Sequence, residues 1–308
     1  MPDLLAHLLT RPPMAEPCEA LSAWWPRMLL AGVPFARGID RAVAAGFAAD
    51  RLGWAFVAGY HAALGRLVPT LSPDLPAALA ATEAGGAHPR AITTHLIQAE
   101  DGAWRLTGTK HFVTLGRHAR TLLVVASTGM DPEGRNALRL VQVDSEAPGV
   151  SLVTLPETPF APEIEHAAAT FEAVTLPDAA LLPGDGYTLY LKPFRTIEDL
   201  HVVGAALGYL VAVSRRHRWP EALREELMAT LVAVRALAAE DPASPAIHVA
   251  VAGMFRALGR GIEAVEAAWA EAPDAEYTRW VRDRGLLQVA ARVRAQRVAA
   301  AWTRLGSG

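Results

Sequence analysis

The sequence predicts an α+β protein in which helices at both ends flank a central antiparallel β-barrel or sandwich. Ala- and Leu-rich helical patterns fill the first part, short β-leaning runs with turn signals follow, and helical patterns then return. This order indicates segregated layers and not the strand–helix alternation of a doubly wound sheet. We therefore expect an N-terminal helical domain over 1–76, a central β domain over 77–186 and a C-terminal helical bundle over 187–308.

Composition sets limits on the class of protein. The chain has 308 residues, of which 52% are hydrophobic and 20% charged, so it can form a large core and is not disordered. The formal net charge of -3 provides no electrostatic attraction for nucleic acid, and we expect no nucleic-acid partner. A single cysteine, Cys18, excludes an internal disulfide and any CxxC metal or redox motif.

Two features favour a cytoplasmic protein. The first residues lack a basic segment followed by a long apolar core, so we predict no signal peptide. The longest apolar run, residues 202–213, is too short to cross a bilayer but suits a buried helix, so we expect no membrane span. With one cysteine, a reducing cytoplasm is the expected compartment.

The helical segments are read from apolar spacing. Residues 17–68 carry apolar side chains at mixed three- and four-residue spacing, and three prolines in 69–76 end that pattern. Past residue 190, helices are predicted at about 194–217, 221–239 and 245–305, the last of them split near the sequence EAPDAEY.

The strands are read from short β-branched and aliphatic runs. Between 77 and 186 these runs are separated by turn signals, among them the hairpin-favouring pair Asp101-Gly102. The runs are AITTHLIQAE, AWRLTGTKHFVTL, RTLLVVAST, ALRLVQVDS, GVSLVTL and HAAATFEAVTL. Their number and spacing predict an antiparallel barrel or sandwich.

One predicted strand, RLTGTKHFVTLG at 105–116, carries a possible binding face. Residues two apart share a face, which groups Trp104, Leu106, Gly108, Lys110, Phe112 and Thr114. The Phe112 ring and the Thr114 hydroxyl could then bind a planar heteroaromatic ligand by stacking and one hydrogen bond. Gly108 leaves room for close approach of a backbone or a ligand. The alternative is a half-buried hairpin arm with Phe112 in the core.

A Gly-rich turn precedes this strand. The segment AATEAGGAH, residues 80–88, ends a strand in two glycines, and backbone N–H groups in such a turn can bind phosphate oxygens. An ordinary turn is the alternative.

Together these two segments resemble the signature of the acyl-CoA dehydrogenase flavoprotein family. ALAATEAGGAH is similar to the family's Thr-Glu-Pro-Gly loop, and GTKHFVTLG to its Gly-x-Lys-x-aromatic-aliphatic-Thr-Asn-Gly strand. ATFEAVTLPDAALLPGDGY, PFRTIEDLHVVGAALGYL and TRWVRDRGLL match later segments in the same order. The resemblance extends over about residues 40–300 and implies that family's fold, with a shortened N-terminal helical part.

The resemblance implies FAD as cofactor and α,β-dehydrogenation of an acyl-CoA thioester as reaction. Thr82 would hydrogen-bond the flavin, Phe112 would pack against the isoalloxazine, and Thr114 would reach its N5 edge. Arg195 would lie at the start of the helix that flanks the active site. Family members are usually dimers or tetramers, so a homodimer or homotetramer is expected.

The usual catalytic base is missing from both positions that the family uses. The base must take the α-proton while the flavin accepts the β-hydride. Ala291 stands at the position nine residues after Arg282, and Phe194 stands immediately before Arg195. Both positions normally carry Glu in one or another group of members.

Glu198 is the best remaining candidate for the base, with Asp199 behind it. Glu198 lies one helical turn beyond Phe194 on nearly the same face. The alternative is structural: Thr196 and Asp199 fit a helix-capping box, and Arg195 with either acid fits an ordinary ion pair within a helix.

The basic run SRRHRW, residues 214–219, ends the same predicted helix. The family has an Arg-x-x-Phe-Gly element near this place that contacts the FAD phosphates of a neighbouring subunit, so Arg216 or Arg218 could bind them. The alternative is a cationic helix C-terminus. The histidines show no metal-ligand spacing, and no metal site is predicted.

Two other functions stay open at this stage. The family's Gly-Gly-x-Gly stretch, which contacts the adenosine half of FAD from a neighbouring subunit, is replaced by WAEAPDAEY. This change and the missing base fit a non-catalytic binding or partner subunit that keeps the fold. A flavin-dependent oxidase or monooxygenase is the other alternative, in which a different group such as His201 handles protons.

Overall fold

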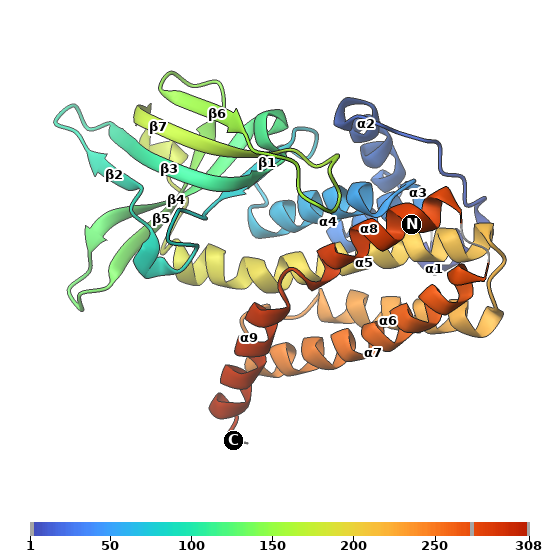
Figure 1. The fold of residues 1–308 in the computed structure, drawn as a ribbon. Coiled ribbons are helices and arrows are strands. Elements are labelled where there is room, and N and C mark those ends of the chain that lie inside the picture. The colour runs from blue at the N-terminus through green and yellow to red at the C-terminus, as the bar shows by residue number, and fades with distance from the viewer. Residues whose placement is uncertain (1–2, 272–273, 307–308) are drawn as a thin grey trace. The chain divides into compact units, whose positions relative to one another are not determined.

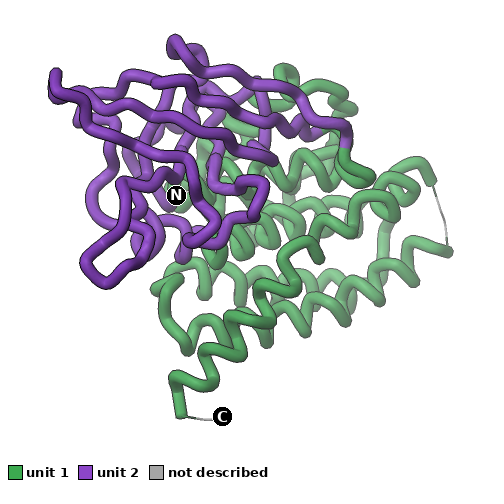
Figure 2. The backbone as a smooth tube through the Cα atoms, turned by 60° about the vertical axis from the view of Figure 1, so that its left-hand side comes forward, with its two compact units in different colours: residues 1–66, 158–163, 195–308 green, residues 67–157, 164–194 purple. Residues whose placement is uncertain are grey.

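The computed structural model describes residues 3–271 and 274–306. The chain forms two compact units, shown in different colours in Figure 2. A helical unit comprises residues 1–66, 158–163 and 195–308, and a β unit comprises residues 67–157 and 164–194. The division into three domains that the sequence suggests stays a prediction.

The β unit contains a seven-stranded sheet within the described residues (Figure 1). Its strands are β1 (Ala77–Ala80), β2 (His95–Gln98), β3 (Trp104–Thr114), β4 (Thr121–Met130), β5 (Asn136–Asp144), β6 (Val150–Thr154) and β7 (His166–Leu176). The order is β1-β4-β2-β3-β7-β6, and β5 also pairs with β4. Each predicted run forms a strand, and β1 is added before them. The pairing is mostly antiparallel, but β1 and β2 both run parallel to β4.

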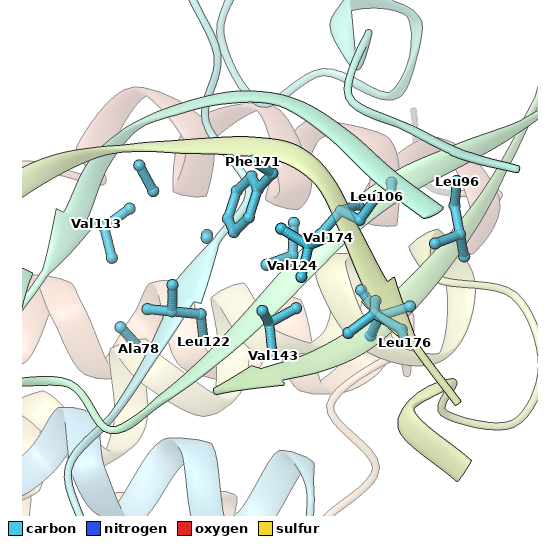
Figure 3. Close-up of a cluster of buried hydrophobic side chains, with 14 of the residues drawn as sticks. Ala78, Leu96, Leu106, Val113, Leu122, Val124, Val143, Phe171, Val174 and Leu176 are labelled. Atoms are coloured by element: carbon cyan, nitrogen blue, oxygen red, sulfur yellow. The ribbon is translucent and has the colours of Figure 1, made fainter. Parts of the chain in front are cut away.

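The core of the β unit is built from aliphatic side chains on one face of the sheet. Leu106 and Val113 of β3 meet Phe171 and Val174 of β7 in a buried cluster, which Figure 3 shows from the side. Residues 122–126 of β4 are fully buried, as a central strand requires.

The helical unit is built mainly from α-helices, drawn in blue and in yellow to red in Figure 1. They are α1 (Leu4–Thr10), α2 (Leu21–Gly32), α3 (Gly38–Ala48), α4 (Leu52–Leu67), α5 (Lys192–Arg216), α6 (Glu221–Leu237), α7 (Pro245–Ala270), α8 (Ala275–Asp283) and α9 (Ala291–Arg304). The predicted segment 17–68 is thus three helices, and 245–305 is also divided into three. Residues 272–273, within the predicted break, lie outside the described residues.

Helix α5 packs very closely against α3 and α4 through glycines. A Cβ at Gly46 of α3 would lie 2.0 Å from the carbonyl oxygen of Ala205, and one at Gly59 of α4 would lie 2.5 Å from the Cα of Val202. In the reverse direction, a Cβ at Gly208 of α5 would lie 2.2 Å from the carbonyl oxygen of Val43. Backbone therefore touches backbone, which only glycine permits.

Residues Tyr187–Arg216, a helical turn followed by α5, are long and apolar enough to cross a membrane. However, 94% of the most apolar stretch is buried inside the protein. This burial fits the core helix that its composition predicts.

Candidate functional site

Strand β3 presents the Phe112 ring outward through an irregularity in its pairing. Lys110 pairs with Ala169 of β7, but the next paired residue, Val113, faces Ala167, so β3 holds one extra residue between them. Phe112 occupies this bulge with a left-handed φ of 51°. Its side chain is 60% exposed, while Val113 is fully buried. The bulge therefore turns the ring out of the core.

The predicted single face of β3 is wrong for this reason. Leu106 and Lys110 are 0% exposed and point into the unit, whereas Phe112 is on the outside. The alternative with Phe112 in the core is also wrong. By strand periodicity Thr114, two residues on and partly exposed, shares the outer face with Phe112. Phe112 and Thr114, the two proposed ligand contacts, thus remain on the same face, although the regular alternation of β3 is broken between Lys110 and Val113.

Gly108 confirms the expectation of a close approach, and the approaching residue is Thr94, with both its side chain and its backbone. The φ of Gly108 is +147°, and a Cβ there would lie 2.5 Å from Thr94 Oγ1 and 2.6 Å from the Cα of Thr94. Only glycine fits this contact between β3 and the residue that precedes β2.

A buried ion pair fixes the Gly-rich turn to β3. The Lys110 Nζ donates to Glu83 Oε1 at 2.6 Å, and the Lys110 side chain is 0% exposed. Glu83 also accepts hydrogen bonds from Thr93 N and Oγ1 and from Thr94 N. Burial alone would raise the pKa of Glu83, but Lys110 and these donors lower it to about 2. Burial lowers the pKa of Lys110 to about 8, so both partners are charged at neutral pH.

Thr82 lies next to the outward ring. Its carbonyl oxygen accepts a hydrogen bond from the backbone N–H of His111 at 2.7 Å, which joins the turn to the residue before Phe112. The N–H groups of Glu83 and Gly86 bond reciprocally to each other's carbonyl oxygens. These two donors of the predicted phosphate-binding turn are therefore used inside the turn.

His166 belongs to the same group of residues and was missed by the sequence reasoning. It pairs in register with Thr114, and its ring contacts Phe112 edge to face with centroids 6.2 Å apart. Burial lowers its pKa, and its Nδ1 lies 3.0 Å from the carbonyl oxygen of Ile164. The sequence showed only that His166 begins a predicted strand, and the pairing of that strand with the end of β3 comes from the fold.

In the helical unit, the start of α5 carries Glu198 and Asp199 in different surroundings. Asp199 is buried and forms ion pairs with Arg294, at 2.9 Å, and with Arg297, both from α9. Glu198 is partly exposed, and within the described part of the chain no side chain forms an ion pair with it. Burial, and then the charge of Asp199, raise the pKa of Glu198 to about 7.

The structural alternatives for this segment are wrong in detail. Helix α5 begins at Lys192, so Thr196 is inside it and does not cap it. The Thr196 hydroxyl instead accepts a hydrogen bond from Arg297 at 2.9 Å. Among the described residues, Arg195 forms no ion pair with either acid, although its charge acts on Glu198.

The arginines at the end of α5 differ from each other. Arg216 is paired with Glu276 of α8 and donates to the carbonyl oxygen of Pro13 at 3.3 Å. Arg218 is exposed and adopts a left-handed φ of 53° just beyond the helix. His201, the other candidate for proton transfer, is buried, and burial lowers its pKa to about 4.

Comparison with known proteins agrees with the resemblance seen in the sequence. Residues 78–174 match the family described as acyl-CoA dehydrogenase, middle domain. None of the curated protein sequences matches this chain.

Solved structures extend the likeness in fold to nearly the whole chain. An FAD-dependent dehydrogenase superimposes with a TM-score of 0.74 and 15% identity, over 99% of this chain and 97% of that one. The butyryl-CoA dehydrogenase of Megasphaera elsdenii gives 0.70 and 14%, over 94% and 91%. The prolyl acyl carrier protein oxidase AnaB gives 0.68 and 16%, over 92% and 91%. The predicted acyl-CoA dehydrogenase-like fold is confirmed, and the chain is a divergent example of it.

Proposed function

We propose that this chain binds a flavin against the outer face of β3 and is an oxidoreductase of the acyl-CoA dehydrogenase type. The observation that carries the proposal is the outward Phe112 ring, 60% exposed at a strained backbone position. A non-glycine residue with a left-handed φ is costly and concentrates at functional sites. An exposed aromatic ring is a natural platform for a planar ligand.

The residues around this ring fit an isoalloxazine. Thr114 supplies a hydroxyl on the same outer face, and Thr82 is joined to the neighbouring His111 by a backbone hydrogen bond. The buried pair of Glu83 and Lys110 holds the Thr82 turn rigid beneath them. FAD is the proposed flavin, with Thr82, Phe112 and Thr114 as its contacts.

Fewer side chains are suited to bind the phosphates of FAD. Arg216 is already engaged by Glu276, so Arg218, which is exposed, is the better of the two proposed phosphate ligands. Arg195 keeps its proposed place beside the substrate or cofactor at the start of α5.

A bound flavin supplies a hydride acceptor for the oxidation of a carbon–carbon bond. The chain must then supply a base for the α-proton of an acyl-CoA thioester, and we assign that role to Glu198. A carboxyl group with a pKa of about 7 can both take and release a proton near neutral pH. Asp199 is less suited, because two arginines hold its carboxylate. It would position α5 for Glu198.

The test is the absorbance spectrum of the purified protein, followed by addition of acyl-CoA. We expect a flavin spectrum that bleaches with substrate. Glu198→Gln should abolish bleaching while flavin stays bound, and Glu225→Gln, an exposed acid on α6, is the matched control. Bleaching that survives in Glu198→Gln removes Glu198 from the reaction, and protein that takes up no flavin refutes the proposal.

Two other functions keep specific support. A non-catalytic binding or partner subunit is favoured by Ala291 and Phe194 at the usual base positions and by the engaged Arg216. Colourless protein that takes up no FAD would identify it. An oxidase is supported by the fold of AnaB, a prolyl acyl carrier protein oxidase. Oxygen consumption by the reduced protein would identify that function.

We further propose a homodimer or homotetramer located in the cytoplasm. Size-exclusion chromatography with light scattering tests the assembly.

A further inference from the structure

Three potential metal ligands meet within the helical unit, at the end of α5 and the start of α8. The Nε2 atom of His217 lies 3.1 Å from Glu276 Oε2 and 3.5 Å from Asp274 Oδ2. All three ligand atoms lie within 4.8 Å of one another. This cluster could not be predicted from the sequence, because His217 is remote along the chain from Asp274 and Glu276.

The other oxygen of each acid already has a partner. Asp274 Oδ1 accepts the backbone N–H of Tyr277 at 2.7 Å, as the N-cap of α8. Glu276 Oε1 is paired with Arg216. The remaining oxygens, Asp274 Oδ2 and Glu276 Oε2, face His217. Metal ligands are typically oriented by outer hydrogen-bond partners of this kind.

The surroundings contain buried donors that lack acceptors. The Trp269 ring contacts His217 with centroids 5.7 Å apart, and its Nε1 has no partner among the residues that the structure describes. Tyr209, two turns before Arg216 on the same face of α5, is 0% exposed, and its hydroxyl also lacks a partner within the described ranges. Burial, and then the charge of Glu276, raise the pKa of this hydroxyl.

Unpaired buried donors are rare and call for an explanation. A metal-bound water or hydroxide in this cluster would be such an acceptor. The cluster thus offers three ligands for an ion, and the Trp269 ring beside His217 carries a buried donor without a partner among the described residues.

We propose that His217, Asp274 and Glu276 bind a divalent transition-metal ion, for which Zn²⁺ is the best match. Tetrahedral zinc with bonds of about 2.0–2.1 Å separates its ligand atoms by about 3.3 Å. The measured separations of 3.1 and 3.5 Å from His217 bracket that value. One imidazole with two carboxylates suits Zn²⁺, whereas Mg²⁺ prefers six oxygen ligands. The fourth position takes water.

The ion would join two elements of the helical unit that lie far apart in sequence. His217 follows the last turn of α5, Asp274 is the N-cap of α8, and Glu276 lies in the first turn of α8. Binding would therefore stabilise the folded helical unit, because the three ligands are close together only when it is folded. This proposal does not depend on flavin binding.

Isothermal titration calorimetry on chelator-treated full-length protein tests the proposal, with Zn²⁺ and Mg²⁺ as the titrants. We expect one Zn²⁺ per chain, much weaker binding of Mg²⁺, and a rise in the melting temperature with Zn²⁺. His217→Ala should weaken Zn²⁺ binding at least about 100-fold, more than loss of an outer partner does. His118→Ala, which removes an exposed histidine of the β unit, is the control and should bind as the unaltered protein does.

Asp274→Asn provides a second variant that keeps the helix cap, because Asn caps helices as well as Asp does. It should fold normally and lose about tenfold in Zn²⁺ affinity. Equal Zn²⁺ affinity in the unaltered protein and in both ligand variants would overturn the proposal, as would the lack of stoichiometric Zn²⁺ binding.

Discussion

Replacing Lys110 by Met should destabilise the β unit by about 3 kcal/mol. The ammonium group is 0% exposed and lies 2.6 Å from Glu83, so the substitution leaves a buried carboxylate without its counter-charge. Removing one partner of a buried ion pair costs about 3–5 kcal/mol. The lower end applies here, because Thr93 and Thr94 still donate three hydrogen bonds to Glu83.

The double variant Glu83→Gln with Lys110→Met separates the charge from the packing. With the carboxylate replaced by an amide, part of the 3 kcal/mol should return, because no buried charge is then unpaired, although the new NH2 group cannot accept the hydrogen bonds that one Glu83 oxygen accepts from Thr93 or Thr94. The assay is urea unfolding of both variants followed by circular dichroism, with the free energy of unfolding extrapolated to zero urea. A Lys110→Met cost below about 1 kcal/mol, or a double variant as unstable as the sum of its singles, would refute the reasoning.

The remaining predictions concern the outward ring, the candidate base and the helix contacts. Phe112→Ala should weaken flavin binding about 2- to 12-fold with little effect on stability, whereas Ile97→Ala, equally exposed on β2, should change neither. Since burial raises the pKa of Glu198 from 4.5 to about 7, its ionisation removes stability as the pH rises through this range. Glu198→Gln should then gain up to about 3 kcal/mol over the unaltered protein between pH 5 and pH 8, and a pH-independent difference contradicts this. Gly46→Ala should lower the melting temperature, because its Cβ would lie 2.0 Å from a carbonyl oxygen of α5, while Gly65→Ala, in open space among the described residues, should raise it slightly.

The local pattern of residues in the sequence was sufficient to predict the strands and most of the helices. The runs from HLIQ to HAAATFEAVTL became β2 to β7, because β-branched residues and turn signals act over short distances. Strand β1 was indicated only as the strand that ends in the Gly-rich turn, since AALA itself carries no β-branched residue to distinguish it from a helix. The predicted start of α5, at about 194, lies close to the observed start at Lys192, but the alternative cap at Thr196 was wrong, because Thr196 and Asp199 are bound by arginines from α9.

The candidate site depended on information that is not local. Period-two alternation placed Phe112 with Leu106 and Lys110, and the bulge between Lys110 and Val113 reversed that assignment. The bulge could not be predicted from the residues of this segment, because its left-handed position is occupied by Phe and not by the Gly that is typical there. His166 and the cluster at His217 lie beside residues remote in sequence, so only the fold brings them together.

The extra residue in β3 has a consequence for how this segment can change over time. Substitution at position 112 changes a side chain that is mostly exposed to solvent and packs little against the core. Loss of a single codon at 111 or 112 would instead remove the bulge and restore unbroken alternation after Lys110, with one outward position between Lys110 and Val113 and no left-handed residue there. A changed side chain at 112 therefore leaves the backbone of the segment as it is, whereas a changed length removes the backbone conformation that now presents the ring.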